Sequence, residues 1–350
     1  MPSTDSPRIL ICRLSAIGDC ILTAPLACAL RSRFTRAYLA WAIEPAAGAV
    51  LQGHPALDEL IVVPKGWFKS WRSITRIRRE LRARHFEVAI DPQSLTKSAL
   101  LAWLSGAHAR IGFAAPRGRE LSKWTNNVLV SATRSHLLDA QLELLRPLDI
   151  VEPSVEFALP RDAAAERSAT QMLAGLHLGC PYAVLNVGAG WNSRLWPTCR
   201  YGRVARWLGE TRRMPSLVVW SGEKELAWAE DVVANSGGHA LLAPATSLRE
   251  LQAILRKARM YLGSDTGPMH LAVASGTPCV VLFGTTRPEE SGPYGSLHVR
   301  VQHRYQPGSS RQRRRAGNDA MREITCEMVT AACEQLFHKL DGGSVPQRAA

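Results

Sequence analysis

The sequence predicts an α/β protein made of two Rossmann-like domains, each with a doubly wound parallel sheet. Apolar runs of five to seven residues alternate with helical patterns along almost the whole chain. These runs contain few polar residues, which is typical of strands that helices cover on both faces. The alternation stops and restarts once, around a segment with two prolines at 152–164 that we interpret as a linker. A length of 350 residues fits two domains of ordinary size.

The elements follow in order. In the first half, strands are expected at 9–14, 37–43, 59–63, 87–91 and 109–113, and helices near 20–33, 71–84, 96–105 and 135–147. In the second half, strands are expected at 182–188, 216–222, 239–243, 259–264 and 278–284, and helices near 162–176, 200–212, 223–235, 247–258, 268–275 and 323–340.

We therefore place the domains at 1–155 and 156–322, followed by a closing helix over 323–340. Residues 341–350 are expected to form a disordered tail. Ligands of doubly wound folds bind outside the carboxyl ends of the strands, so two such domains are expected to face a cleft.

The composition points to a chain that meets an anionic partner. Lysine and arginine number 43 against 30 acidic residues, and 36 of the basic residues are arginine, which suits phosphate and carboxylate. The excess is shared by both halves, and it favours nucleic acid, anionic lipid or a phosphorylated glycan. No apolar run is long enough for a membrane span, and no secretory signal is recognisable. The eight cysteines are scattered without CxxC or zinc-ligand spacing, so we expect thiols in a reducing cytoplasm, no metal and no cofactor.

The first candidate site follows the first expected strand. Residues 14–19 (LSAIGD) lead directly into a helix, and neither GxGxxG nor a Walker A loop occurs, which removes the main support for a dinucleotide or P-loop site. Asp19, after Gly18, is placed at the carboxyl end of a strand, where a carboxylate can act as a general base. The alternative is that Asp19 is only a helix N-cap.

Three segments of the second half are suited to phosphate and ribose. Small residues in 187–197 (VGAGWNSRLWP) allow backbone amides to approach an anion, and Arg194 can form two bonds to phosphate oxygens. Thr266 and Gly267 open a short helix whose N–H groups suit phosphate, with His270 one turn further in as either a catalyst or a buried core residue. Glu225, beyond the strand at 216–222, can accept bonds from ribose hydroxyls or be a solvated first-turn residue.

A basic segment at 65–84 contains eight basic residues and one acid, with Trp67, Phe68 and Trp71 among them. Its Arg72, Arg76 and Arg79 fall on one helical face, beside aromatic residues that can meet a lipid surface. A nucleic-acid surface would look similar, and a solvated helix is the third alternative. A second basic cluster, 311–315, lies in an expected loop.

In this order the motifs resemble the bacterial ADP-heptose:lipopolysaccharide heptosyltransferases, glycosyltransferase family 9. The resemblance spans about residues 8–335 and rests on these segments: RILICRLSAIGDCILTAPL, DPQSLTKSALLA, SGAHARIGF, VGAGWNSRLWP, LGSDTGPMHLAVASGTPCVVLFGTT, PYG and AMREIT-x-EMV. It implies a GT-B fold and an inverting, metal-independent enzyme that moves a heptose from ADP-heptose to an anionic, lipid-linked lipopolysaccharide inner core. It also implies a cytoplasmic protein, peripheral at the inner membrane, without nucleic acid as partner.

The resemblance also implies roles for single residues. Asp19 matches the proposed catalytic base, and Lys97 matches a basic position near the acceptor, where we also place Arg72, Arg76 and Arg79. The donor phosphates and sugar are assigned to Gly18, Gly190, Arg194, Asp265, Thr266, Gly267 and His270. Glu225 matches the ribose-binding glutamate, and Thr246 stands where a methionine approaches adenine.

The chain departs from the family pattern at several of these points. Arg194 replaces a common lysine, Ala16 stands where some members have serine, and Ala189 and Gly190 replace hydroxyl-bearing residues. The loop QPGSSRQRRRAGNDAM stands where relatives often have cysteines. Two alternatives stay open: a transferase of the same fold that uses another nucleotide sugar, and a nucleic-acid-binding α/β protein.

Overall fold

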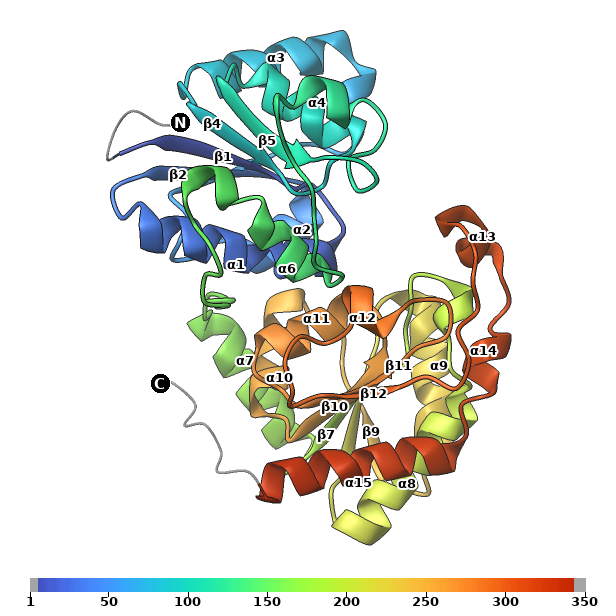
Figure 1. Ribbon diagram of the computed structural model, residues 1–350. Coiled ribbons are helices and arrows are strands. Elements are labelled where there is room, and N and C mark those ends of the chain that lie inside the picture. The colour runs from blue at the N-terminus through green and yellow to red at the C-terminus, as the bar shows by residue number, and fades with distance from the viewer. Residues whose placement is uncertain (1–5, 343–350) are drawn as a thin grey trace. The chain divides into compact units, whose positions relative to one another are not determined.

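The computed structural model describes residues 6–342, which fold into two compact units (Figure 1). The division falls after Pro160, inside the segment 152–164, whereas the sequence placed the boundary after residue 155. We call residues 1–160 the N-terminal unit and residues 161–350 the C-terminal unit. Each contains one six-stranded parallel sheet, so the predicted fold class of two doubly wound α/β units is confirmed.

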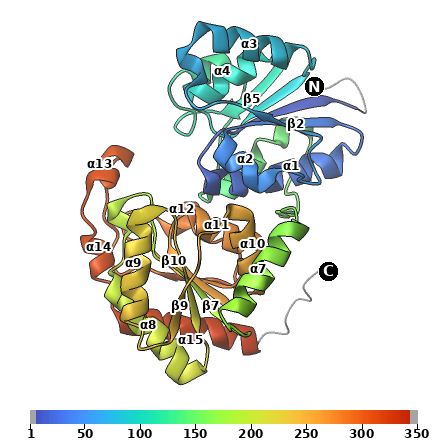
Figure 2. The ribbon, with the colours of Figure 1, turned by 180° about the vertical axis from the view of Figure 1, so that it is seen from behind.

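The sheet of the N-terminal unit has the order β3-β2-β1-β4-β5-β6. Its strands are β1 (Arg8–Cys12), β2 (Tyr38–Ile43), β3 (Glu59–Val62), β4 (Val88–Asp91), β5 (Ala109–Phe113) and β6 (Val128–Val130). Ile11 of β1 is opposite Trp41 and Ile90, so β1 lies at the centre with its side chains fully buried from Ile9 to Cys12. One face is covered by α1 (Ile17–Arg33), α2 (Pro45–Leu51) and α6 (Leu137–Glu143), and the other by α3 (Trp71–Arg82) and α4 (Thr96–Leu104) (Figures 1 and 2).

The sheet of the C-terminal unit has the order β12-β11-β10-β7-β8-β9. Its strands are β7 (Ala183–Asn186), β8 (Ser216–Val219), β9 (Ala240–Leu242), β10 (Met260–Ser264), β11 (Cys279–Leu282) and β12 (Val299–Val301). One face is covered by α8 (Thr198–Arg212), α9 (Gly222–Ala234) and α15 (Cys326–Gly342), and the other by α7 (Ala163–Gly175), α10 (Leu248–Lys257) and α11 (Gly267–Ala274) (Figures 1 and 2). Because every strand is parallel, all six carboxyl ends meet at one edge of the sheet.

The structure adds elements that the sequence analysis did not expect. Two are the edge strands β6 and β12, of three residues each. The others are short helices: α2, α5 (Ser122–Thr125), α12 (Pro288–Ser291), α13 (Ser310–Arg315), α14 (Asp319–Arg322), and the 3-10 turns η1 (Trp67–Lys69), η2 (Arg146–Leu148) and η3 (Asn192–Arg194). The basic cluster 311–315 is therefore helical, not a loop.

The closing helix and the expected tail also differ from the prediction. The helix α15 begins at Cys326 and continues to Gly342, so residues 341 and 342 belong to it. It buries Val329, Cys333 and Leu336 against the sheet, which explains why it extends over five turns. The remainder of the expected tail, 343–350, lies outside the described residues.

Candidate functional site

Asp19 lies in the first turn of α1, directly after the carboxyl end of β1. Its Oδ2 is 2.6 Å from Nη2 of Arg13 and accepts a hydrogen bond of 3.4 Å from the backbone N–H of Ala16. The N-cap of α1 is Ala16, so Asp19 is the third helical residue and not the cap itself. The Asp19 side chain is 39% exposed, whereas its partner Arg13 is 6% exposed. A substrate hydroxyl can therefore reach the carboxylate, while the guanidinium stays out of solvent.

Arg13 is a buried cation that the sequence analysis did not single out. Its Nη1 donates to the carbonyl of Pro92 at 3.0 Å, and its own carbonyl accepts a bond of 2.9 Å from Trp41 Nε1. The next residue, Leu14, donates its N–H to Gln93 Oε1 at 2.9 Å. The bonds from Trp41 and Gln93 hold the backbone at 13–14, and the bond to Pro92 holds the guanidinium, which pairs with the Asp19 carboxylate. The sequence feature that could have identified Arg13 is its charge inside the otherwise apolar run ILICRL.

Lys97 lies at the same edge of the N-terminal sheet, in the first turn of α4. Its Nζ contacts Ser15 Oγ at 2.9 Å and Glu44 Oε1 at 3.1 Å. Ser15 belongs to the loop that precedes Asp19, and Glu44 follows β2 directly. The structure thus brings Lys97 next to the loop that precedes Asp19. It also adds Ser15 and Glu44 to the candidate site residues at this edge. Gly18 is buried in the first turn of α1, where it supports this loop.

Asp91 is a fully buried carboxyl at the end of β4, behind this edge. Its Oδ1 accepts from Ser94 N–H at 2.8 Å, and its Oδ2 accepts from Asn126 Nδ2 at 3.1 Å. Burial raises the pKa of Asp91 to about 6, and the hydrogen bonds oppose that shift only in part. The Asp91 carboxyl therefore changes charge at mildly acidic pH.

The arginines of the basic segment lie on the exposed side of α3. Arg72, Arg76 and Arg79 are all exposed, and Arg76 pairs with Glu80 at 3.6 Å. The three aromatic residues of this segment differ in exposure. Trp67 is 2% exposed and packs in the core, so the prediction that it meets a lipid surface is wrong. Phe68 and Trp71 remain exposed at 45% and 76%. Three further apolar side chains are exposed in the same unit: Trp103 on α4, Leu121 at the N-cap of α5, and Trp124 on α5.

In the C-terminal unit, Arg194 ends the 3-10 turn η3 that follows β7. Its Nη1 donates to the carbonyl of Asp265 at 2.6 Å, and its Nη2 is 3.5 Å from Asp265 Oδ2. Its guanidinium carbon lies 4.0 Å from the ring centre of Trp191. Gly190, before this turn, is exposed, and a Cβ added there would meet no atom within 4 Å. The loop is therefore open on one side, with one fixed cation beside it.

The segment 264–270 connects β10 to α11 as the sequence predicted. Thr266 is the N-cap of α11, and Pro268 lies in its first turn, so the positive end of the helix dipole is at Thr266 and Gly267. Asp265 is buried, and its Oδ1 is 3.7 Å from Nε2 of His270. His270 is 6% exposed, which favours the interpretation of a buried residue that orients Asp265.

Glu225 lies in the first turn of α9, after β8. Its Oε2 accepts a hydrogen bond of 2.9 Å from Ser221 N–H, and burial raises its pKa above the usual value. A Cβ added to Gly188 would lie 2.2 Å from the Glu225 carboxylate, so only glycine leaves room for it. The glutamate is thus packed against the β7 loop and is not a freely solvated residue. Thr246, half-buried, follows β9 and precedes the N-cap of α10.

The order of the strands places these residues along one line. Asp265 and Thr266 follow β10, Arg194 follows β7, Glu225 follows β8, and Thr246 follows β9, and these four strands are consecutive neighbours in the sheet. An extended ligand at this edge would meet a cation and a helix N-terminus first, then a carboxylate, then Thr246. That order fits a nucleoside diphosphate, with its phosphates at Arg194 and its ribose at Glu225.

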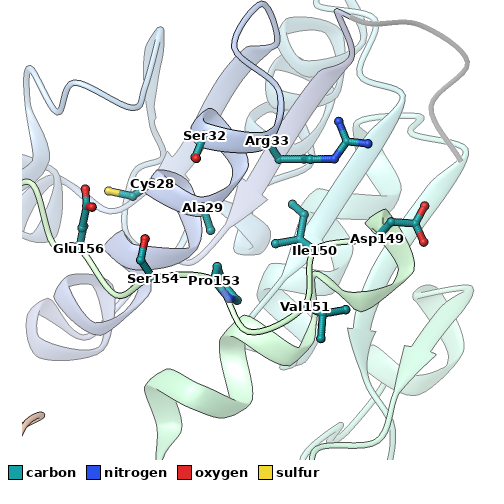
Figure 3. Close-up of a pocket in the computed structure, with 10 residues that line it drawn as sticks. All are labelled: Cys28, Ala29, Ser32, Arg33, Asp149, Ile150, Val151, Pro153, Ser154 and Glu156. Carbon is teal, nitrogen blue, oxygen red and sulfur yellow. The ribbon is translucent and has the colours of Figure 1, made fainter.

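A cavity of about 370 Å³ lies elsewhere in the N-terminal unit (Figure 3). It is lined by the second half of α1, including Cys28 and Arg33, and by the segment 149–156, including Asp149 and Glu156. Because α1 runs back from the carboxyl edge, this cavity is separated from Asp19 along the helix. None of the candidate residues lines it.

Residues 6–342 contain neither a metal-binding cluster nor a membrane-spanning helix. Within this range, no three His, Cys, Asp or Glu side chains are grouped so as to hold a metal ion. All eight cysteines are free thiols. No helix in the same range is long and apolar enough to cross a membrane.

Comparisons with known proteins identify relatives that match most of the chain. Residues 74–319 match the model of glycosyltransferase family 9 (heptosyltransferase). The chain is 26% identical over 306 residues to lipopolysaccharide heptosyltransferase 1 of Pseudomonas aeruginosa, covering 84% of this chain and 83% of that protein. It is similar in fold to a family 9 glycosyltransferase from Veillonella parvula, with a TM-score of 0.84, 22% identity and coverage of 97% and 99% of the two chains. An E. coli heptosyltransferase solved with ADP has a TM-score of 0.75 at 22% identity, covering 94% and 99%.

Proposed function

The chain belongs to glycosyltransferase family 9, the heptosyltransferases, and we propose that it transfers a heptose from ADP-heptose to a lipopolysaccharide inner-core acceptor. The observation that carries the proposal is the line of Asp265, Thr266, Arg194 and Glu225 along four neighbouring strand ends. This line matches the chemistry of a nucleoside diphosphate. The E. coli relative that was solved with ADP supports adenine as the base.

On the donor side, the departing group is a nucleoside diphosphate that gains negative charge as the bond to the sugar breaks. Arg194 and the first-turn N–H groups of α11 are fixed positive groups that stabilise this charge. They do so without a metal ion, and we propose that the reaction is metal-independent for this reason. Asp265 accepts bonds from Arg194 and lies beside His270, so it holds the cation in place.

On the acceptor side, we propose Asp19 as the general base. The acceptor O–H gives its proton to the Asp19 carboxylate, and its oxygen attacks the anomeric carbon. The bond from that carbon to the diphosphate oxygen breaks, and its electron pair leaves with the diphosphate. Attack from the side opposite the leaving group inverts the anomeric configuration. Arg13 acts as a positioning residue, because it is held by Pro92 and ion-paired with Asp19.

Lys97 is proposed to bind an acidic group of the acceptor. It is half-buried beside Ser15, in the loop that carries Asp19. Its present partner Glu44, at 3.1 Å, would have to share the ammonium group with the acceptor. A cation at this position places the acceptor near the base, which lowers the entropic cost of the reaction.

The exposed side of α3 is proposed to meet the membrane that carries the acceptor. Arg72, Arg76 and Arg79 supply positive charge, and Phe68 and Trp71 beside them supply exposed aromatic surface. This combination is suited to an anionic lipid surface, where each basic residue contributes about 1 kcal/mol. We therefore propose a cytoplasmic enzyme that is peripheral at the inner membrane.

A donor panel tests the proposal. Purified protein is incubated with an acceptor extract and, in turn, ADP-heptose, other ADP-sugars, GDP-sugars and UDP-sugars, and nucleotide release is measured. We expect release of ADP from ADP-heptose at least about tenfold faster than from any other donor, with no loss of rate in EDTA. Faster turnover of a GDP- or UDP-sugar would favour the alternative transferase, to which the open position at Gly190 and the departure at Thr246 point.

A further inference from the structure

The arginine-rich helix α13 is attached to the loop that carries Arg194. Ser193 Oγ donates to the carbonyl of Arg313 at 2.7 Å and contacts Thr285 Oγ1 at 3.2 Å. Arg313 Nη1 donates to the carbonyl of Thr285 at 3.1 Å. Further along, Asn318 Nδ2 donates to the carbonyl of Leu195 at 2.9 Å. A segment about 120 residues away in sequence is thus fixed to both sides of Arg194.

This helix carries charge that the described part of the chain does not neutralise. No acidic residue occurs between Glu290 and Asp319, and that stretch contains six arginines. A capping box formed by Ser309 and Gln312 holds the helix, with bonds of 3.3 and 2.8 Å. Arg311, Arg314 and Arg315 are exposed, and among residues 6–342 none of them has a carboxylate partner. Three such cations within five residues repel one another.

Trp191 brings one of these arginines next to the candidate phosphate site. The guanidinium carbon of Arg194 is 4.0 Å from the ring centre of Trp191, and that of Arg314 is 5.2 Å from the same centre. Two cations on one indole repel each other unless an anion lies near both. Arg194 has Asp265 at 3.5 Å, whereas no acid accompanies Arg314 in the described structure. The arrangement therefore suits a ligand with several negative oxygens.

We propose that α13 is a second cationic contact for the diphosphate of the nucleotide-sugar donor, with Arg314 as its main ligand and Arg311 and Arg315 in support. The proposal rests on the proposed function and adds residues to its donor site. Ser193, Trp191 and Thr285 follow β7 and β11, at the edge where Asp265 and Glu225 also lie. The sequence of α13, SRQRRR, contains no apolar residue. It therefore lacks the exposed aromatic side chains with which the η1–α3 segment can contact a lipid surface.

Calorimetry with ADP, AMP, adenosine and inorganic pyrophosphate tests this assignment. The variants are Arg314→Gln, the triple variant Arg311→Gln, Arg314→Gln, Arg315→Gln, and Arg194→Ala as a comparator. The control is Arg167→Gln on α7, on the opposite side of this unit from α13 (Figures 1 and 2). Because Arg311, Arg314 and Arg315 are exposed, their replacement leaves the packing of Ser193 and Arg313 intact. Unchanged melting temperatures check that the variants fold.

We expect the triple variant to weaken ADP and pyrophosphate binding about 5- to 30-fold, AMP less, and adenosine within about twofold. The loss should shrink at high salt, and Arg167→Gln should bind ADP like the parent. ADP binding within about twofold of the parent in the triple variant, while Arg194→Ala loses affinity, would overturn the role of α13 and leave the proposed function intact. A raised KM for the acceptor with unchanged ADP affinity would also overturn it. A parent protein that binds no nucleoside diphosphate would instead overturn the proposed function.

Discussion

Asp19 and Asp58 are two aspartates of the N-terminal unit that form similar ion pairs. Each lies 2.6 Å from an arginine, Arg13 or Arg31, and their side chains are 39% and 42% exposed. They differ in position, because Asp19 follows β1 at the carboxyl edge, whereas Asp58 directly precedes β3. Comparing variants of the two aspartates therefore distinguishes the loss of an ion pair from the loss of a catalytic base.

We expect Asp19→Asn to reduce kcat by about 10²- to 10⁴-fold while ADP binding stays unchanged, because an amide cannot take up the proton of the acceptor hydroxyl. Steady-state kinetics and calorimetry measure the two effects. Asp58→Asn is the matched control and should keep kcat within about twofold. Turnover of the Asp19 variant equal to that of this control would leave Asp19 with only a role in the first turn of α1.

At the residue scale, the sequence predicted the positions of side chains that belong to a local motif. Asp19, Arg194, Thr266 and Glu225 all follow strands, and the structure places each at a carboxyl edge. Arg13 was missed because its burial depends on Pro92, 79 residues further along the chain. Glu44 was missed for a similar reason, since its partner Lys97 is 53 residues away.

At the scale of elements, all the central strands were predicted, together with the edge strands β3 and β9, whereas the edge strands β6 and β12 were not. The central strands read as continuous apolar runs because helices cover both faces. The strands β6 and β12 have three residues each and pair on one side only, and Arg300 interrupts the apolar pattern of β12. The helix α13 was not predicted because the surrounding glycine and serine residues are typical of a loop. Its capping box, Ser309-x-x-Gln312, is the sequence pattern that indicates the start of a helix there.

The helix α3 is the element whose function is most directly testable. We expect the triple variant Arg72→Gln, Arg76→Gln, Arg79→Gln to raise the acceptor KM and to reduce binding to anionic liposomes by about tenfold or more, because three surface charges are lost. The affinity for ADP should not change, and the difference in liposome binding should disappear at high salt. Sedimentation with liposomes and kinetics at several salt concentrations measure these effects.

A control with the same change in net charge is Arg167→Gln, Arg203→Gln, Arg206→Gln, on the exposed surfaces of α7 and α8. Equal liposome binding by the two triple variants would show that α3 has no special role at the membrane. A fall in ADP affinity in the α3 variant would assign this helix to the donor and not to the acceptor.

At the scale of the whole molecule, the buried carboxyl of Asp91 couples stability to pH. Its pKa is about 6 in the folded protein, above the ordinary 3.8, because burial disfavours the charge. The folded state therefore holds a proton between about pH 4 and 6 that the unfolded state has lost. The stabilisation from this group is complete below about pH 4 and is lost as the pH rises through about 6.

Asp91→Asn should remove this dependence, because the amide stays neutral and keeps the shape of the protonated carboxyl. Asn126 Oδ1, which has no partner in the described structure, can turn to accept from the new amide group. We expect the variant to be more stable than the parent at pH 8 by up to about 3 kcal/mol, and equally stable below about pH 4. Urea unfolding from pH 4 to 8 measures the difference, and parallel curves for the two proteins would refute the assignment.

We propose that this protein forms a bond between a heptose and a lipid-linked acceptor. Mass spectrometry of the acceptor, after incubation with purified protein and ADP-heptose, tests it most directly. We expect the acceptor to gain the mass of one heptose residue, in amounts equal to the ADP released, and we expect neither change with Asp19→Asn. Release of ADP without any gain in mass on the acceptor, or no release at all, would contradict it.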